Sequence, residues 1–128
     1  PKAIIFDVAH NLDGFIELKK ALKLFFPNKK VRVVFGFSKQ KDTLSCLKLL
    51  KTFSSFIHVT EAKSFKSLPK EEIKKALLKI NFKKYKIEKN ISVAILDAKN
   101  LAIKNKEILL ICGSFYILDE IKKQLKIK

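Results

Sequence analysis

The sequence predicts an α/β protein with a Rossmann-like, mostly parallel sheet flanked by helices. Short apolar runs alternate along the chain with longer segments of helical periodicity, and short polar loops join them. This alternation is typical of a doubly wound parallel sheet, because each strand is reached from the previous one through a crossover helix. The apolar strands also indicate that the sheet is buried on both faces.

The first strand and helix are predicted from a short apolar run and the periodic segment after it. Ala3–Phe6 is the strand, since polar residues bound it on both sides. Asp13–Phe26 is the helix, and Pro27 and Asn28 stop it. Its buried face is expected to carry Phe15, Leu18, Leu22 and Phe25.

Two further strands surround a capped helix. Val31–Phe35 is the second strand and ends at Gly36. Asp42 or Thr43 caps the helix that follows. Phe56–Thr60 is the third strand, and a polar loop rich in lysine and serine comes after it. The apolar positions of the helix are Leu44, Leu47 and Leu50.

The third helix and the fourth strand are short. Pro69 opens the helix at its first turn, where Glu71 and Glu72 suit the positive end of the helix dipole. Lys84–Ile87 is a short strand. The inward face of the helix comprises Ile73, Ala76, Leu77 and Ile80.

The last third of the chain predicts two helices around a buried strand. Asn90 caps the first helix, and Tyr116–Leu125 is the second. Between them, Ile108–Cys112 is nearly pure apolar and is therefore expected to be central in the sheet. The inward residues of the Asn90-capped helix are Ile91, Ala94, Ile95, Ala98 and Leu101.

Composition describes one folded domain. The chain has 128 residues, of which 48% are hydrophobic and 31% charged, so a disordered chain is excluded. No apolar run reaches membrane-spanning length, and we expect a cytoplasmic protein without a membrane partner. The first residue is proline, which we interpret as the start of a domain excised from a longer chain.

The formal net charge of +16 raises a nucleic-acid-binding function as an alternative. Arg32 is the single arginine, although arginine is the residue that phosphate and base recognition favours. The lysines are spread along the chain without interleaved aromatic residues. We therefore interpret them as a solvated surface and expect no nucleic-acid partner.

The two cysteines do not form a metal-binding pattern. Cys46 lies in a helix and Cys112 ends a strand, with no CxxC spacing. We expect two buried thiols and no metal site. The histidine within the third strand, His58, is expected to be a structural or edge residue.

Three polar clusters follow predicted strands, and each precedes a helix. Because parallel strands share a direction, the three clusters are expected on one edge of the sheet, where such sheets bind ligands. Helix N-termini there favour anions. There is no GxxxxGK[ST] or GxGxxG loop, so the chain is expected to supply only part of a nucleotide site. The clusters are Asp7–Asn11, Gly36–Asp42 and Gly113–Tyr116.

Each cluster also has a purely structural interpretation. Asp7 is a possible helix cap, and His10 a surface side chain of the first turn. Lys41 beside Asp42 is a possible solvated lysine next to a cap, and Ser114 a possible cap of the last helix. Because all three clusters are expected at the same edge, a ligand-binding role is favoured over these structural interpretations.

These residues together resemble the C-terminal domain of the folylpolyglutamate synthase/dihydrofolate synthase family, within the Mur ligase superfamily. The resemblance covers the whole chain, 1–128. It rests on Asp7-Val-Ala-His10-Asn11, Gly36 before Lys41-Asp42, Val59-Thr60, Ser67-Leu68-Pro69 and Gly113-Ser114-Phe-Tyr116. A cell-wall Mur ligase domain is the nearer alternative, but Gly36–Asp42 lacks the Gly-Asp-Arg-type sequence expected there.

The resemblance implies an ATP-dependent ligase that joins L-glutamate to dihydropteroate or folate through an acyl phosphate. It implies ATP and Mg²⁺ as cofactors, with the magnesium ligands in a central P-loop domain that precedes this one. That domain would be the partner of this chain within a monomer. The isolated chain is then expected to be inactive.

The resemblance also assigns roles to individual residues. Asp7 would accept hydrogen bonds from the ribose hydroxyls of ATP, while His10 would lie near the phosphates or the reacting centre as the catalytic residue. Asn11 would set the loop of this nucleotide site. Lys41 would hold a carboxylate of glutamate, and Ser114, with Tyr116, would contact the other end of that substrate.

Overall fold

The computed structural model describes residues 3–7, 9, 11–39, 42–63, 66–113 and 122. The predicted last helix, Tyr116–Leu125, lies outside this part apart from Lys122. The described strands are β1 (Ile4–Asp7), β2 (Val31–Phe35), β3 (Ser54–Val59), β4 (Tyr85–Ile87) and β5 (Ile108–Cys112). The described helices are α1 (Leu12–Phe25), α2 (Thr43–Lys51), α3 (Lys70–Lys79) and α4 (Ile91–Asn105).

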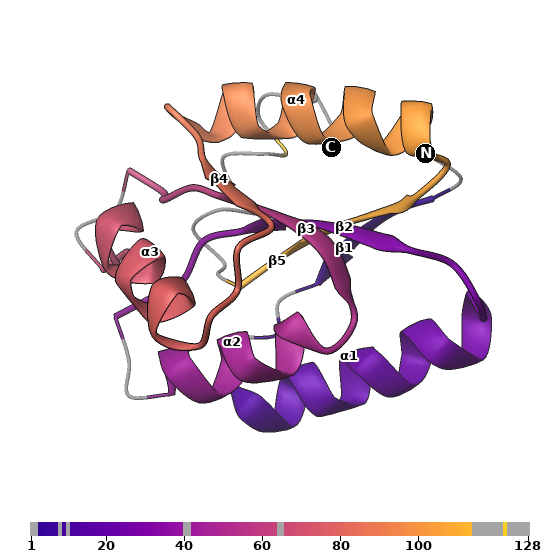
Figure 1. The fold of residues 1–128 in the computed structure, drawn as a ribbon, viewed down its shortest axis with the longest axis horizontal. Coiled ribbons are helices and arrows are strands. Elements are labelled where there is room, and N and C mark those ends of the chain that lie inside the picture. The colour runs from indigo at the N-terminus through magenta and orange to yellow at the C-terminus, as the bar shows by residue number, and fades with distance from the viewer. Residues whose placement is uncertain are drawn as a thin grey trace.

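The five described strands form one sheet in the order β1-β5-β2-β3-β4, and every neighbouring pair is parallel. Helices α1, α2 and α3 cover one face and α4 covers the other (Figure 1). This confirms the predicted α/β fold with helices on both faces. The apolar strand β5 lies between β1 and β2, which explains why all five of its residues are buried.

The core has one part on each face of the sheet, because successive strand residues point to opposite sides. Val33 belongs to the larger part under α1–α3, and Val34 belongs to the smaller part under α4. The rings of Phe35 and Phe37 stack in the larger part with their centroids 5.2 Å apart. Phe15 of α1 packs against both rings.

Helix α1 corrects one predicted core residue. Phe15, Leu18 and Leu22 are buried as predicted, but the side chain of Phe25 is 71% exposed. Phe26 packs against the core instead. The helical repeat of 3.6 residues explains this, since the position after Leu22 on the same face is four residues further on.

The other helices agree closely with the predictions. Asp42 occupies the cap position of α2, although its side chain makes no capping bond. The side chain of Asn90 accepts a hydrogen bond from the Val93 N–H at 2.9 Å and caps α4. Leu101 is only partly buried, and Ala102 faces the core beside it.

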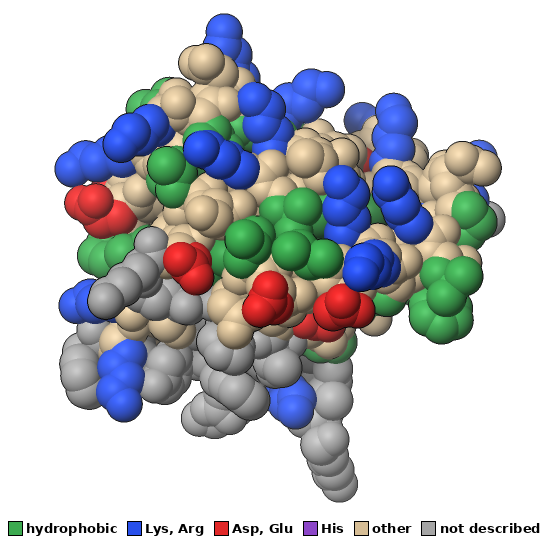
Figure 2. Space-filling model, turned by 90° about the horizontal axis from the view of Figure 1, so that it is seen from below, with side chains coloured by type: hydrophobic (Ala, Val, Ile, Leu, Met, Phe, Trp, Pro, Cys, Tyr) green, Lys and Arg blue, Asp and Glu red, His purple; other side chains and the backbone are tan. Residues whose placement is uncertain are grey.

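Exposed lysines occur on helices of both faces of the sheet, such as Lys20 of α1 and Lys104 of α4. On the side covered by α1–α3, lysines are interspersed with hydrophobic, neutral and acidic side chains (Figure 2). Leu24 and Phe25 at the end of α1 are exposed hydrophobic residues. None of the described helices is long and apolar enough to span a bilayer.

Candidate functional site

The carboxyl ends of β1, β5 and β2 meet at one edge of the sheet. Cys112 at the end of β5 pairs with Asp7 on one side and with Phe35 on the other. The chain moves outward from β2 to β3 and β4, whereas β5 and β1 lie on the opposite side of β2. The strand order therefore reverses between β5 and β2, and such a switch point is where open α/β sheets bind ligands.

The structure brings together the described members of the three predicted clusters. Asp7, Gly36 and Gly113 all lie at this switch point, because each ends or directly follows one of the three adjacent strands. Asn11 lies at the start of α1. Four predicted site residues fall outside the described residues, namely His10, Lys41, Ser114 and Tyr116.

Gly36 and Gly113 pack against each other with their backbones. The Gly36 N–H donates to the carbonyl oxygen of Cys112 at 3.4 Å. Gly113 has a φ of +113°, and a Cβ atom on it would lie 1.9 Å from the Gly36 carbonyl oxygen. Only glycine fits this conformation and this contact, so the two loops can begin side by side.

The carboxylate of Asp7 is held in a fixed orientation at the end of β1. Its Oδ1 accepts a hydrogen bond from the Ala9 N–H at 2.7 Å, which is an Asx turn. An ionised carboxylate offers about four acceptor positions, so this bond leaves capacity for the hydroxyl groups of a ligand. Asp7 does not cap α1, and its interpretation as a helix cap is wrong.

Asn11 provides the helix cap. Its backbone is extended, and its side-chain oxygen accepts from the Gly14 N–H at 2.9 Å. This bond begins α1 directly after the Asp7–Asn11 segment. The Asn11 side chain therefore determines where α1 begins.

The loop after β2 is paired with the loop after β3, a contact that the sequence did not predict. Ser38 and Ser67 form an antiparallel bridge. The Lys39 N–H donates to the Lys66 carbonyl at 2.9 Å, and the Leu68 N–H donates to the Phe37 carbonyl at 2.7 Å. These bonds hold the beginning of the Gly36–Asp42 cluster at the same edge as Asp7.

A buried charged network, which the sequence did not predict, lies under α4. Arg32 Nε donates to Glu107 Oε1 at 2.7 Å, and its Nη1 lies 3.0 Å from His58 Nε2. The guanidinium also lies over the Phe56 ring, 4.9 Å from its centroid. Ser55 Oγ donates a hydrogen bond to the second carboxylate oxygen of Glu107.

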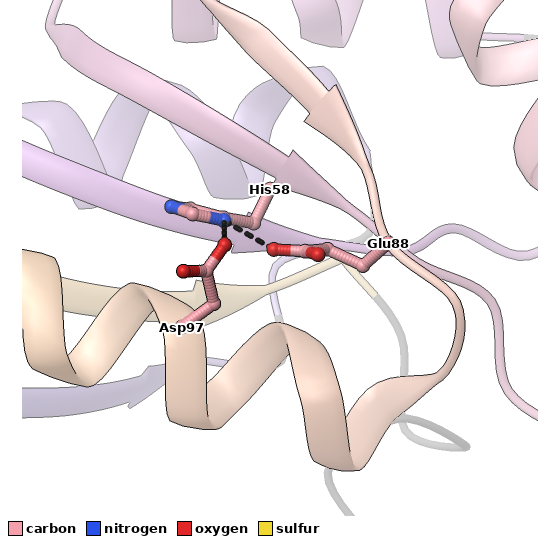
Figure 3. Close-up of side chains that lie close together, drawn as sticks. All are labelled: His58, Glu88 and Asp97. Atoms are coloured by element: carbon pink, nitrogen blue, oxygen red, sulfur yellow. Dashed lines mark hydrogen bonds and ion pairs between the residues drawn. The ribbon is translucent and has the colours of Figure 1, made fainter.

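The network continues from His58 to β4 and α4 (Figure 3). His58 Nδ1 lies 2.6 Å from Glu88 Oε2 and 3.6 Å from Asp97 Oδ2. Lys86 Nζ approaches Asp97 at 3.2 Å and Glu88 at 3.7 Å. His58 and Glu88 are both buried, whereas the Lys86 side chain is 57% exposed.

The three ligand-type atoms of His58, Glu88 and Asp97 lie within 4.8 Å of one another, a spacing that suits a metal ion. Two contacts argue against a bound metal ion at these three residues. Because the Arg32 guanidinium can only donate, His58 Nε2 is the acceptor and Nδ1 carries the proton that a metal would replace. The Lys86 ammonium already supplies a positive charge to the carboxylates.

We therefore expect Zn²⁺ to leave the stability of the chain unchanged. A specific ligand of the folded state raises the melting temperature with its concentration. Thermal unfolding followed by circular dichroism, with and without excess Zn²⁺, measures this directly. A concentration-dependent rise that disappears in His58→Asn would establish a metal site.

The two thiols are buried, as predicted. Burial raises the pKa of Cys46 to about 11, and burial also raises the pKa of Cys112 well above its ordinary value. Both are therefore thiols at neutral pH. Neither acts as a thiolate nucleophile in this state.

Comparison with known proteins identifies the family. The family model for the Mur ligase, glutamate ligase domain, matches residues 1–115. The chain is 30% identical over 126 residues to dihydrofolate synthase/folylpolyglutamate synthase of Bacillus subtilis (strain 168), covering 96% of this chain and 28% of that protein. It is 27% identical to the probable dihydrofolate synthetase of Schizosaccharomyces pombe, covering 97% of this chain and 31% of that protein.

Solved structures share the fold. A folylpolyglutamate synthase of Mycobacterium tuberculosis, complexed with ADP and AMPPCP, superposes with a TM-score of 0.89 at 20% identity. That match covers 98% of this chain and 30% of the other. The FolC protein of E. coli, in complex with DHPP and ADP, superposes with a TM-score of 0.78 at 22% identity, covering 96% and 28%.

The chain therefore belongs to the Mur ligase family, as its glutamate ligase domain. It spans less than a third of the length of the curated relatives described above. Because those relatives are dihydrofolate and folylpolyglutamate synthases, the comparisons do not favour a nucleic-acid-binding module or a cell-wall ligase domain.

Proposed function

We propose that this chain is the C-terminal domain of an ATP-dependent ligase that joins L-glutamate to dihydropteroate or to a folate. One observation about the site supports this proposal most directly. The Asp7 carboxylate and the Gly36–Gly113 contact meet at the strand-order reversal of a domain whose family is that of glutamate ligases.

The ligands of the structural neighbours support the substrate class. A bifunctional folylpolyglutamate synthase/dihydrofolate synthase has been solved with Mn, AMPPNP and L-glutamate bound, and FolC of E. coli with DHPP and ADP. We extend nucleotide, divalent metal and glutamate use from those proteins to the protein that contains this chain. The metal is Mg²⁺ in this proposal, held by a preceding P-loop domain, where it would neutralise charge on the phosphates.

The proposed reaction has two steps. A carboxylate oxygen of the pteroate or folate attacks the γ-phosphorus of ATP, which forms an acyl phosphate and releases ADP. The amino nitrogen of glutamate then attacks the acyl carbon, which forms the amide and releases inorganic phosphate and a proton. Both steps depend mainly on positioning and on stabilising charge.

In this proposal each residue of the edge orients one of the reactants. Asp7 accepts hydrogen bonds from the ribose hydroxyls, and Asn11 holds the Asp7 segment against α1. His10 lies near the phosphates as the catalytic residue. On the substrate side, Lys41 binds a carboxylate of glutamate, and Ser114 with Tyr116 binds its other end.

The first test is Asp7→Ala in the full-length protein that contains this chain. We expect the efficiency of ATP use to fall by about 10²-fold, because the ribose loses an orienting acceptor. Steady-state kinetics with varied ATP measure this. Asp13→Ala on the exposed surface of α1 is the matched control and is expected to retain wild-type rates.

His10→Ala in the same protein is expected to lower turnover by a similar factor, about 10²-fold, if its role is positioning. Wild-type rates for both Asp7→Ala and His10→Ala would show that this edge is merely structural. The 128-residue chain alone is expected to show no folate-dependent ATP hydrolysis, because its partner is the P-loop domain. Robust hydrolysis by the chain alone would contradict that dependence.

A further inference from the structure

We propose that Glu88 holds a buried proton, which it donates to Asp97, and that this shared proton fastens α4 to β3 and β4. The site lies under α4, on the side of the sheet opposite α1–α3. It is separate from the sheet edge where Asp7, Gly36 and Gly113 meet, called the Asp7 edge below, and it does not depend on the proposed function.

His58 is neutral, and its single ring proton is on Nδ1. The Arg32 guanidinium only donates hydrogen bonds, so His58 Nε2 must accept from Arg32 Nη1 at 3.0 Å. A second proton on the ring would place two donors against each other. His58 Nδ1 therefore donates to Glu88 Oε2 at 2.6 Å.

The two carboxyl groups then share one compensating cation. The Lys86 ammonium approaches both, but it is closer to Asp97 than to Glu88. Glu88 is buried to 1% exposure, whereas the Asp97 side chain is 29% exposed. A carboxylate oxygen of Glu88 and one of Asp97 lie within 4.8 Å of each other. Two carboxylates this close with one ammonium favour a proton on one of them, and the buried partner takes it because ionisation costs most there.

The charged groups around Glu88 come from every element packed against it. His58 of β3 and Lys86 of β4 face it directly, and Asp97 of α4 has a carboxylate oxygen within 4.8 Å of it. Arg32 of β2 and Glu107, just before β5, act through His58. Lys70 of α3 donates to the backbone carbonyls of Glu88 and Lys89, at 2.9 and 3.0 Å, and so ties the same turn to α3.

The titration of these groups agrees with the geometry. Burial, followed by the hydrogen bond to Asp97, raises the pKa of Glu88 from 4.5 to about 7. Burial, followed by the charge of Arg32, lowers the pKa of His58 from 6.5 to about 4. The hydrogen bond from Glu88 lowers the pKa of Asp97 below its ordinary value of 3.8. Asp97 is therefore ionised over the pH range in which Glu88 titrates.

The two shifts have opposite effects on stability. Glu88 binds its proton more tightly when folded, so its contribution is complete below pH 4.5 and is lost as the pH rises to about 7. His58 binds a proton less tightly when folded, so its contribution is lost as the pH falls from 6.5 to about 4. Each corresponds to roughly a 20- to 40-fold change in the folding equilibrium constant between pH 5 and 7.

The test compares the chain with Glu88→Gln and with the surface variant Glu71→Gln. The glutamine amide mimics the protonated carboxyl, because it donates to Asp97 and accepts from His58 but cannot ionise. The folding constant of Glu88→Gln, divided by that of the unmodified chain, is expected to rise by roughly 40-fold from pH 5 to pH 7. Urea unfolding at several pH values measures this ratio, and the ratio for Glu71→Gln is expected to stay constant.

A constant ratio for Glu88→Gln would overturn the proposal, since Glu88 would then be ionised in the folded state throughout. A carbon-13 titration of the Glu88 carboxyl in the unmodified chain gives an independent answer that requires no variant to fold. The proposal predicts a midpoint near 7, moving lower in Asp97→Asn. A midpoint at the ordinary value of 4.5 would refute it.

Discussion

Replacing Arg32 by leucine is expected to lower the free energy of unfolding by about 3–5 kcal/mol, the usual cost of removing one partner of a buried ion pair. Arg32 is 7% exposed and donates hydrogen bonds to Glu107 and His58 from two different nitrogens. Its loss leaves the Glu107 carboxylate buried at 2% exposure with only Ser55 as a donor among the described contacts. Urea unfolding at pH 7 measures the change.

Two control variants identify the cause of the Arg32→Leu effect. Arg32→Lys keeps the charge, but a single ammonium lacks the planar fork that reaches both partners, so an intermediate loss is expected. Lys104→Leu on the exposed surface of α4 is expected to change stability by less than about 0.5 kcal/mol. If Arg32→Leu were as stable as Lys104→Leu, the network would contribute nothing to the folded state.

Replacing Gly113 by alanine is expected to be the most damaging single change at the Asp7 edge. The φ of +113° costs about 1–3 kcal/mol for a residue with a side chain. In addition, the new Cβ would lie 1.9 Å from the Gly36 carbonyl oxygen, a backbone atom that cannot rotate away. We expect a loss of at least about 2 kcal/mol in urea unfolding, together with reduced activity of the full-length protein.

Gly14→Ala is the matched control for Gly113→Ala. A Cβ at Gly14 would meet Ala9 Cβ and Asn11 Oδ1 at 3.3 Å, so a small adjustment accommodates it. Alanine also favours the helix by up to about 1 kcal/mol, which offsets that contact. Equal stability of the Gly113→Ala and Gly14→Ala chains would show that the Gly36–Gly113 contact is not rigid.

Much of the fold could be predicted because local patterns determine it. The strand Val31–Phe35 and the Asn90 cap were predicted as observed, since an apolar run and a polar cap are local signals. The errors are at the ends of elements. Strand β3 runs from Ser54 to Val59 rather than from Phe56 to Thr60, and one core position at the end of α1 was assigned to the wrong residue. Phe25 and Phe26 are both apolar neighbours, and only the exact winding of α1 decides which one faces the core.

The site could be predicted only in part. Asp7, Gly36 and Gly113 meet because parallel strands align their carboxyl ends, which a sequence can indicate. The buried network could not be predicted, because Arg32 and Glu107 are 75 positions apart and His58 and Glu88 are 30 apart. One signal was present: a lone arginine in a lysine-rich chain, within an otherwise apolar strand.

The bridge between Ser38 and Ser67 connects the loop after β2 to the loop after β3. A displacement of residues 36–39 is therefore expected to move residues 66–68 as well, because two backbone hydrogen bonds couple them. The start of α3, at Lys70, is then within reach of the same movement. A ligand that moves the loop after β2 would therefore also shift the start of α3, which closely follows residues 66–68.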